Sequence, residues 1–150
     1  MKKLKIVAWA MLLLVAFTGC EPSVNGPGNN KKNVVVGEWS LVQWNEESPE
    51  FHVYVKFDSN GTFEMYQQIW SFDYELFKGE YTLSGDVLTG VYEDGSNWAC
   101  GYRVELIDGK LHMYSQEDIS VISVYEACTI PAEIITEATT TRAAEVVPFL

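Results

Sequence analysis

Alternating apolar and polar residues dominate the chain beyond its first thirty-odd positions. In the segment Phe51–Phe57, every second side chain is apolar, and His52, Tyr54 and Lys56 occupy the positions between them. This period of two is typical of a β-strand with one buried face. Asn60-Gly61 follows, a dipeptide that readily adopts the positive φ angles of a tight hairpin turn. The pattern therefore predicts antiparallel strands joined by short turns.

The same pattern recurs and predicts eight strands in all. Their expected ranges are Val36–Trp44, Phe51–Phe57, Thr62–Trp70, Leu76–Leu83, Val87–Tyr92, Asn97–Ile107, Lys110–Ser115 and Ser120–Thr129. Such a meander best avoids exposed sheet edges by closing on itself. We expect an all-β fold, an eight-stranded antiparallel up-and-down barrel, whose interior is filled by side chains or holds one small ligand.

The last twenty residues differ from the barrel sequence. Pro131-Ala132-Glu133-Ile134-Ile135 predicts the start of a short helix, with proline in its first turn. Thr136–Leu150 is rich in Thr and Ala, and we expect it to be mobile or only loosely docked. The barrel domain is accordingly assigned to residues 34–130 and a C-terminal helix or tail to residues 131–150.

The N-terminus has the features of a secretory signal. Three lysines precede an uninterrupted apolar run over residues 6–17, which is shorter than the ~20 residues that span a bilayer. Phe17-Thr18-Gly19-Cys20 then resembles the bacterial lipobox, with Phe17 where Leu is commoner. We predict a signal peptide over residues 1–19, a lipid on Cys20 and a flexible linker over residues 20–33. The alternative is an ordinary secretory signal that ends near a cysteine.

Charge limits the choice of partners. The whole chain carries a net charge of −11, and the predicted signal holds three of its ten basic residues and none of its 21 acids. The mature chain would therefore carry 7 − 21 = −14, which disfavours binding to nucleic acid. We expect a protein held at the bacterial cell envelope by its lipid, at the outer membrane.

A short motif in the first predicted strand resembles a family signature. Gly37-Glu38-Trp39 is similar to the Gly-x-Trp motif of lipocalins, and residues 36–129 as a whole look like the lipocalin-like domains of bacterial lipoproteins. The resemblance implies that Gly37 and Trp39 have a structural role and that Trp39 packs at the closed end of the barrel. In lipocalins that tryptophan often contacts a basic residue of the last strand, whereas Ser120–Thr129 contains neither Arg nor Lys.

No catalytic constellation is present in the sequence. His52 and His112 each stand alone among strand residues, and no His/Cys/Asp group has the spacing of a metal site. No glycine-rich phosphate loop or nucleophile elbow occurs. We therefore expect a non-catalytic protein without metal or cofactor.

Two cysteines remain if Cys20 is lipidated. In a meander, Cys100 lies near the start of the sixth strand and Cys128 near the end of the eighth, at opposite rims. A disulfide requires Cα atoms within about 7 Å, so we expect two free thiols. The alternative is a disulfide, which the exported compartment would permit if the last strand bends.

Inward-facing polar and aromatic residues are candidates for a ligand site. Alternation directs Gln67, Trp98 and Tyr102 inward, and an apolar pocket with a few polar groups is typical of small-molecule sites. The leading hypothesis is a barrel that binds a small apolar ligand. The alternative is that these residues only fill the interior.

Outward-facing aromatic residues support a second hypothesis. We expect Tyr66, Trp70, Phe72 and Tyr74 to form a surface aromatic patch at the third strand and the loop after it. Such a patch can bind an envelope protein or a glycan. The alternative is that the apolar residues of the C-terminal tail cover these side chains.

Overall fold

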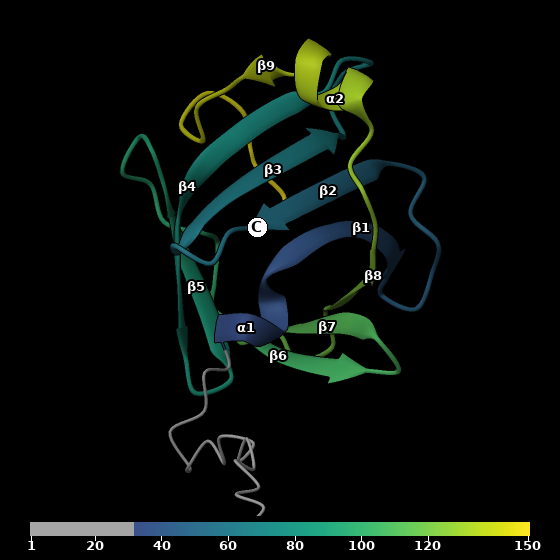
Figure 1. The fold of residues 1–150 in the computed structure, drawn as a ribbon, viewed down its shortest axis with the longest axis vertical. Coiled ribbons are helices and arrows are strands. Elements are labelled where there is room, and N and C mark those ends of the chain that lie inside the picture. The colour runs from purple at the N-terminus through teal and green to yellow at the C-terminus, as the bar shows by residue number, and fades with distance from the viewer. Residues whose placement is uncertain (1–31) are drawn as a thin grey trace, which may run out of the picture.

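Eight antiparallel strands form the barrel that the alternation predicts, as a computed structural model shows for residues 32–150 (Figure 1). The predicted signal peptide, Cys20 and most of the linker lie outside these described residues. The strands are β1 Gly37–Trp44, β2 His52–Phe57, β3 Thr62–Gln68, β4 Glu75–Ser84, β5 Val87–Tyr92, β6 Tyr102–Ile107, β7 Lys110–Ser115 and β8 Ile122–Ala127. None of the helices among residues 32–150 is long and apolar enough to cross a membrane.

Each strand pairs with its neighbours in sequence, and β1 pairs with β8 to close the ring. The β1–β8 ladder joins Trp39 to Ala127 and Trp44 to Ser123, with a bulge between Leu41 and Gln43. The hairpin turns after β2, β4 and β6 lie at one end of the barrel, which we call the closed end. The longer loops 45–51, 69–74, 93–101 and 116–121 lie at the other end, which we call the mouth.

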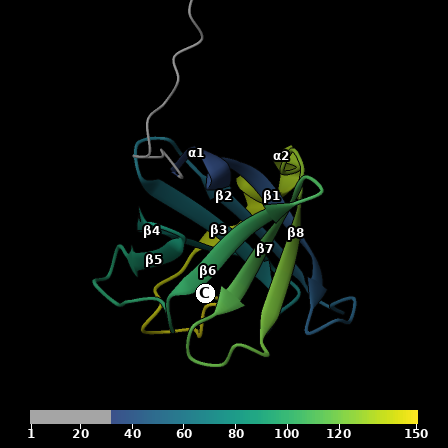
Figure 2. The same cartoon turned by 90° about the horizontal axis from the view of Figure 1, so that it is seen from below.

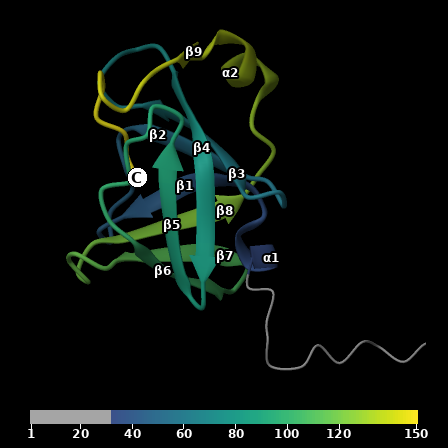
Figure 3. The same cartoon turned by 90° about the vertical axis from the view of Figure 1, so that its left-hand side faces the viewer.

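A single helical turn, α1 Lys32–Val35, covers the closed end (Figure 3). Trp39 is buried there, and its Nε1 donates a hydrogen bond to the Val35 carbonyl oxygen at 2.8 Å. The tryptophan therefore binds a backbone carbonyl, which fits a last strand without Arg or Lys. Gly37 has a φ of 143°, which favours glycine at the point where the chain turns from α1 into β1. The sequence pattern missed α1 because four residues are too few to display a helical period.

Aromatic side chains fill the closed half of the barrel. Phe57 meets Tyr81 with ring centroids 5.0 Å apart, and Phe63 meets Trp98 at 5.1 Å, both edge to face. All four rings are buried in one hydrophobic core. Edge-to-face pairs contribute beyond their buried area, so this half of the interior is a packed core rather than an open cavity.

Trp98 reaches this core from a loop, not from a strand. The predicted strand Asn97–Ile107 begins only at Tyr102, and Asn97 instead bridges back to Val91 on β5. The Trp98 amide donates to the Gly90 carbonyl at 3.0 Å. β5 and β6 pair only through the first two residues of each strand, Val87 with Arg103 and Leu88 with Tyr102. Because the rest of β5 does not pair with β6, the space beside it admits the indole ring. The alternation of residues 97–101 thus reflects this loop packing against β5.

The C-terminal segment is ordered around the barrel, so the expectation of a mobile or loosely docked tail was wrong. Helix α2 Ala132–Glu137 follows β8, and β9 Thr139–Thr140 then pairs in parallel with the start of β4. The chain next turns into the mouth, and its end lies among the strands (Figures 1 and 2). Leu150 is only 1% exposed. The apolar residues of the tail gain this burial because the mouth offers them an apolar interior.

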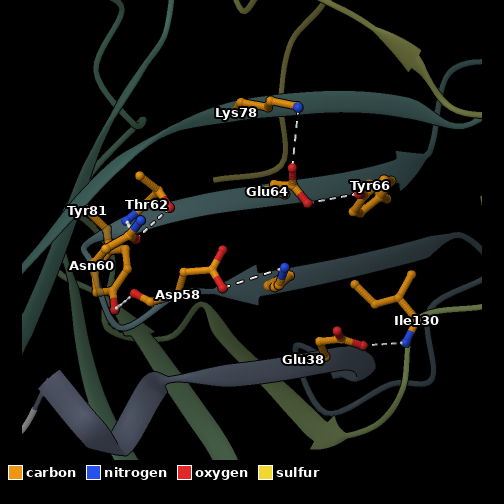
Figure 4. Close-up of polar contacts among 10 residues, drawn as sticks. Glu38, Asp58, Asn60, Thr62, Glu64, Tyr66, Lys78, Tyr81 and Ile130 are labelled. Atoms are coloured by element: carbon orange, nitrogen blue, oxygen red, sulfur yellow. Dashed lines mark hydrogen bonds and ion pairs between the residues drawn. The ribbon is translucent and has the colours of Figure 1, made fainter. Parts of the chain in front are cut away.

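Polar contacts on the outer wall fix the segment that leads from β8 to α2 (Figure 4). The Glu38 carboxylate accepts a hydrogen bond from the Ile130 amide at 2.7 Å. On β3, Glu64 accepts from the Tyr66 hydroxyl at 3.0 Å and pairs with Lys78 on β4 at 3.3 Å. Ile130 and Ile134 then pack on Tyr66 and cover part of the outer wall.

Gly90→Ala tests the packing of Trp98. A Cβ at position 90 would clash with the Trp98 indole ring, and overpacking of this kind costs ~1–3 kcal/mol. We expect the free energy of unfolding, measured by urea denaturation, to fall by about that amount. Thr89→Val on the exposed face of the same strand is the matched control and should leave it nearly unchanged. Equal stability of the alanine variant and the control would refute this account of Trp98.

Candidate functional site

The mouth of the barrel contains a cavity of about 490 Å³. Its walls come from the ends of the strands, the mouth loops and the C-terminal segment. Aromatic rings make up much of the lining: Trp44, Phe51, Trp70, Tyr102 and Phe149. The rings of Trp44, Phe51 and Phe149 form a cluster, with centroids between 5.5 and 6.1 Å apart. A concave, mainly apolar site of this volume is typical of small-molecule binding.

A few polar groups interrupt the apolar lining. The Cys100 thiol lies 3.3 Å from the Ser115 hydroxyl, and Tyr102 stands beside them with a pKa that burial raises. Glu117 and Asp118 are the only charged residues that line the cavity within the described part of the chain. The Asp118 carboxylate accepts hydrogen bonds from Ser120, which lower its pKa. The cavity therefore has an apolar body and an anionic edge.

The four mouth loops are uniformly acidic. They contain eight carboxylates and no lysine or arginine: Glu46, Glu47, Glu50, Asp73, Glu93, Asp94, Glu117 and Asp118. A rim whose charged groups are all carboxylates raises the local concentration of cations and lowers that of anions. Because of this rim, an anionic molecule would approach the cavity against an unfavourable potential.

Gln67 anchors the C-terminal segment at the base of the mouth. Its side chain is fully buried, at 0% exposure. The amide nitrogen donates to the Val147 carbonyl at 3.1 Å and to the Glu75 carboxylate at 3.0 Å, and the amide oxygen accepts from the Phe149 amide at 2.8 Å. Both atoms of this predicted ligand-binding group are therefore bonded to the protein's own tail.

Two further side chains hold the same segment. The Tyr92 hydroxyl donates to the Leu150 carbonyl oxygen at 2.6 Å, and burial raises the pKa of Tyr92. The Trp70 indole nitrogen donates to the Val147 carbonyl at 2.9 Å. As a result the tail forms one wall of the cavity, through Val147, Pro148 and Phe149.

The predicted ligand-binding residues all face the interior but do not form one site. Only Tyr102 lines the cavity. Gln67 lies beneath the tail, and Trp98 is packed among the aromatic rings of the core. Within the described residues, the Trp98 indole nitrogen is buried without a hydrogen-bond partner. Trp98 therefore contributes to the core rather than to the cavity wall.

The predicted surface aromatic patch is divided by the fold. Trp70 and Phe72 are exposed, at 65% and 98%, as expected. Tyr66 is only 1% exposed, so its assignment to the surface was wrong. Helix α2 covers it, as the alternative of a covering C-terminal tail allowed, and burial together with Glu64 raises its pKa. Tyr74 is half-buried in the same outer cluster.

Sequence reasoning missed three of the cavity's aromatic residues, Trp44, Phe51 and Phe149. The first two lie at strand ends, where alternation does not say whether a side chain faces a cavity. Phe149 belongs to the run Val146-Val147-Pro148-Phe149-Leu150. That run is too apolar for a solvated tail, and this was the one available signal that the segment is buried.

Within residues 32–150, the cysteines and histidines form no reactive cluster. Cys100 and Cys128 are both free thiols at opposite ends of the barrel, as their positions predicted. Burial raises the pKa of Cys128, which favours the unreactive thiol form. Among residues 32–150, no three His, Cys, Asp or Glu side chains lie close enough to hold a metal ion.

Comparison with known families agrees with this architecture. The family model of the lipocalin-like domain matches residues 35–113, which is 79 of the 150 residues. The chain belongs to the lipocalin-like family. Members of this family are generally non-catalytic binding proteins. A search of curated proteins finds no match to this lipocalin-like protein.

Two solved structures are similar to this chain. A lipocalin-like protein from Bacteroides uniformis matches with a TM-score of 0.50 at 16% identity, over 63% of this chain and 98% of its own. An uncharacterized protein from Bacteroides eggerthii matches with a TM-score of 0.49 at 18% identity, over 63% and 99%. At these identities the first match supports the fold of the barrel alone.

Acidification should loosen the tail of this lipocalin-like protein through Asp94. The Asp94 carboxylate accepts hydrogen bonds from the Ser96 and Ala144 amides, which lower its pKa below the ordinary 3.8. A lowered pKa means that the contribution to docking is complete above pH 3.8 and is lost as the pH falls through the folded-state pKa. We expect the hydrogen-exchange protection factor of the Ala144 amide to be constant at neutral pH and to fall in that acid range.

Asp94→Ala should lower the same protection factor at neutral pH and abolish its acid dependence. Asp73→Ala, which removes another mouth-loop carboxylate, is the control and should behave as the native chain. An unchanged Ala144 protection factor in Asp94→Ala would contradict the proposed anchor.

Proposed function

We propose that this lipocalin-like protein is a non-catalytic, lipid-anchored protein that binds a small apolar molecule at the bacterial cell envelope. The observation that carries the proposal is the aromatic-lined cavity of about 490 Å³ at the mouth. It is the part of the interior that the packed core of the closed half leaves available. A second hollow, of about 470 Å³, is lined half by charged side chains and suits an apolar ligand less well.

The lining and the rim together support one class of ligand. Five aromatic rings and several aliphatic side chains supply apolar contact. The acidic rim disfavours a carboxylate, sulfate or phosphate on the same molecule. We infer that the ligand is neutral or carries a positive charge, with an apolar body that fits between Trp44, Trp70 and Tyr102.

Filling part of the cavity should weaken the binding of a neutral apolar fluorophore. Ala99 lines the cavity and is exposed at its edge, so Ala99→Trp would occupy part of the space. We expect N-phenyl-1-naphthylamine to bind the mature chain saturably, with enhanced emission, and Ala99→Trp to weaken that binding about tenfold, the effect of losing ~1.4 kcal/mol.

The matched control is Ala127→Trp, an exposed alanine at the closed end of β8. It adds the same ring outside the cavity and should bind the fluorophore like the native chain. Absence of saturable binding by the native chain, or equal loss in both variants, would refute the mouth cavity as a ligand site.

A surface-interaction role is the second candidate. Trp70, Phe72, Ile119 and Val147 expose large apolar surfaces on the mouth loops and the tail. Exposed apolar groups near one another favour a protein or glycan contact. This role would replace the ligand-carrier role if the native chain fails to bind apolar molecules.

The lipid anchor rests on the N-terminal sequence. The motif ending at Cys20 supports acylation there, and acyl chains contribute about 0.8 kcal/mol per buried CH₂. The chain enters the barrel at α1, on the closed end. An anchor at Cys20 would therefore leave the mouth at the far end from the membrane attachment.

Cys20→Ser should prevent lipidation. In cells given an alkyne-tagged fatty acid, we expect the native chain to become labelled and to sediment with membranes, and Cys20→Ser to lose both properties. Cys128→Ser is the control, because that thiol lies on the barrel wall. Labelling that persists in Cys20→Ser would disprove the predicted anchor.

A further inference from the structure

The tail is held in the mouth chiefly through its backbone. Gln67 binds the Val147 carbonyl and the Phe149 amide, Trp70 binds the same carbonyl, and Tyr92 binds the Leu150 carbonyl oxygen. All four bonds go to main-chain atoms. The barrel thus contacts residues 147–150 as it would contact any extended peptide with apolar side chains.

The spacing of these contacts suits a peptide containing proline. The single Gln67 amide donates to the carbonyl of Val147 and accepts from the amide of Phe149, so it spans Pro148. Proline has no N–H group, so its placement between these two contacts leaves no buried donor to satisfy there. Val147 and Phe149 supply the acceptor and the donor on either side.

The last two side chains of the segment lie in apolar surroundings, whereas Val147 is exposed. Phe149 packs against Trp44 and Phe51, with centroids 6.1 and 5.7 Å away. Leu150 is buried in the main core. Removal of the segment would expose these surfaces and leave the buried Gln67 amide without two of its partners, which is unfavourable.

We propose that the space beneath the mouth cavity is a peptide-binding site, which residues 146–150 of the chain itself occupy. Its ligand class is an extended apolar peptide that presents a carbonyl and an N–H group to Gln67 on either side of a proline. A plain acyl chain offers neither group and would leave Gln67 with Glu75 as its only partner among the three that it has here. This site goes beyond the ligand proposed for the mouth cavity, since it lies on the other side of the tail.

The experiment separates the segment from the barrel in the folded full-length protein. A specific protease site is inserted between Thr141 and Arg142, where β9 has ended and Arg142 is exposed. After cleavage and dialysis, a fluorescein-labelled, amidated peptide of sequence Arg142–Leu150 is titrated in and followed by fluorescence anisotropy. We expect saturable binding that unlabelled peptide reverses and a scrambled peptide or a long-chain fatty alcohol does not.

Two comparisons test the Gln67 contact, one by a change in the peptide and one by a change in the barrel. N-methylation of Phe149 removes the one N–H group that donates to Gln67 Oε1, and we expect binding to weaken about tenfold. On the protein side, Gln67→Leu should weaken binding similarly, and Gln116→Leu, the same change at an exposed glutamine, should not.

Each outcome bears on the proposal. If the cleaved barrel loses its folded circular dichroism signal, peptide binding is measured as recovery of that signal, because a ligand stabilises the state that binds it. No binding and no recovery would overturn the proposal, as would equal affinity for the N-methylated peptide. The fluorophore experiment uses the uncleaved chain, so the mouth cavity and the peptide site can fail independently.

Discussion

The buried amide of Gln67 is the contact on which the mouth of this protein depends. Strand alternation on β3 directs it into an apolar interior, where an unpaired amide is costly. The tail backbone supplies two of its partners, and Glu75 supplies a third. This requirement explains why the chain, after crossing the outer wall through α2, turns back into the barrel instead of remaining in solvent. The tail in turn provides a wall of the mouth cavity.

The interior is divided between a packed core and a cavity. At the closed end, Trp39 and α1 cover the barrel, and the rings of Phe57, Phe63 and Trp98 fill it. Glycine at position 90 is what allows the Trp98 indole to lie against β5. Because this half is full, the apolar cavity lies at the mouth, where loops and tail replace regular strand packing.

Charge and apolar surface are arranged in separate layers around that mouth. The aromatic rings lie inside, and the carboxylates lie on the loops that surround them. The tail is held at two depths. Gln67 and Tyr92 bind it inside the barrel, and Asp94 binds it at the acidic rim. The deep contacts resist acidification because the Gln67 amide does not titrate and the Tyr92 hydroxyl, whose pKa is raised by burial, stays protonated. The Asp94 carboxylate can be protonated in acid and would then lose its contact. The mouth therefore combines a stable inner attachment with an outer one that responds to solvent.

The sequence by itself determined the parts of the fold that local rules govern. A period of two predicts a strand wherever it occurs, and so eight strands, their turns, the inward face of Gln67 and the separation of Cys100 from Cys128 were all predictable. The fate of Tyr66, the loop origin of Trp98 and the insertion of Leu150 were decided only by the tertiary structure. Each depends on a contact between segments far apart in the chain, and no local pattern encodes which distant segment will cover a given apolar side chain.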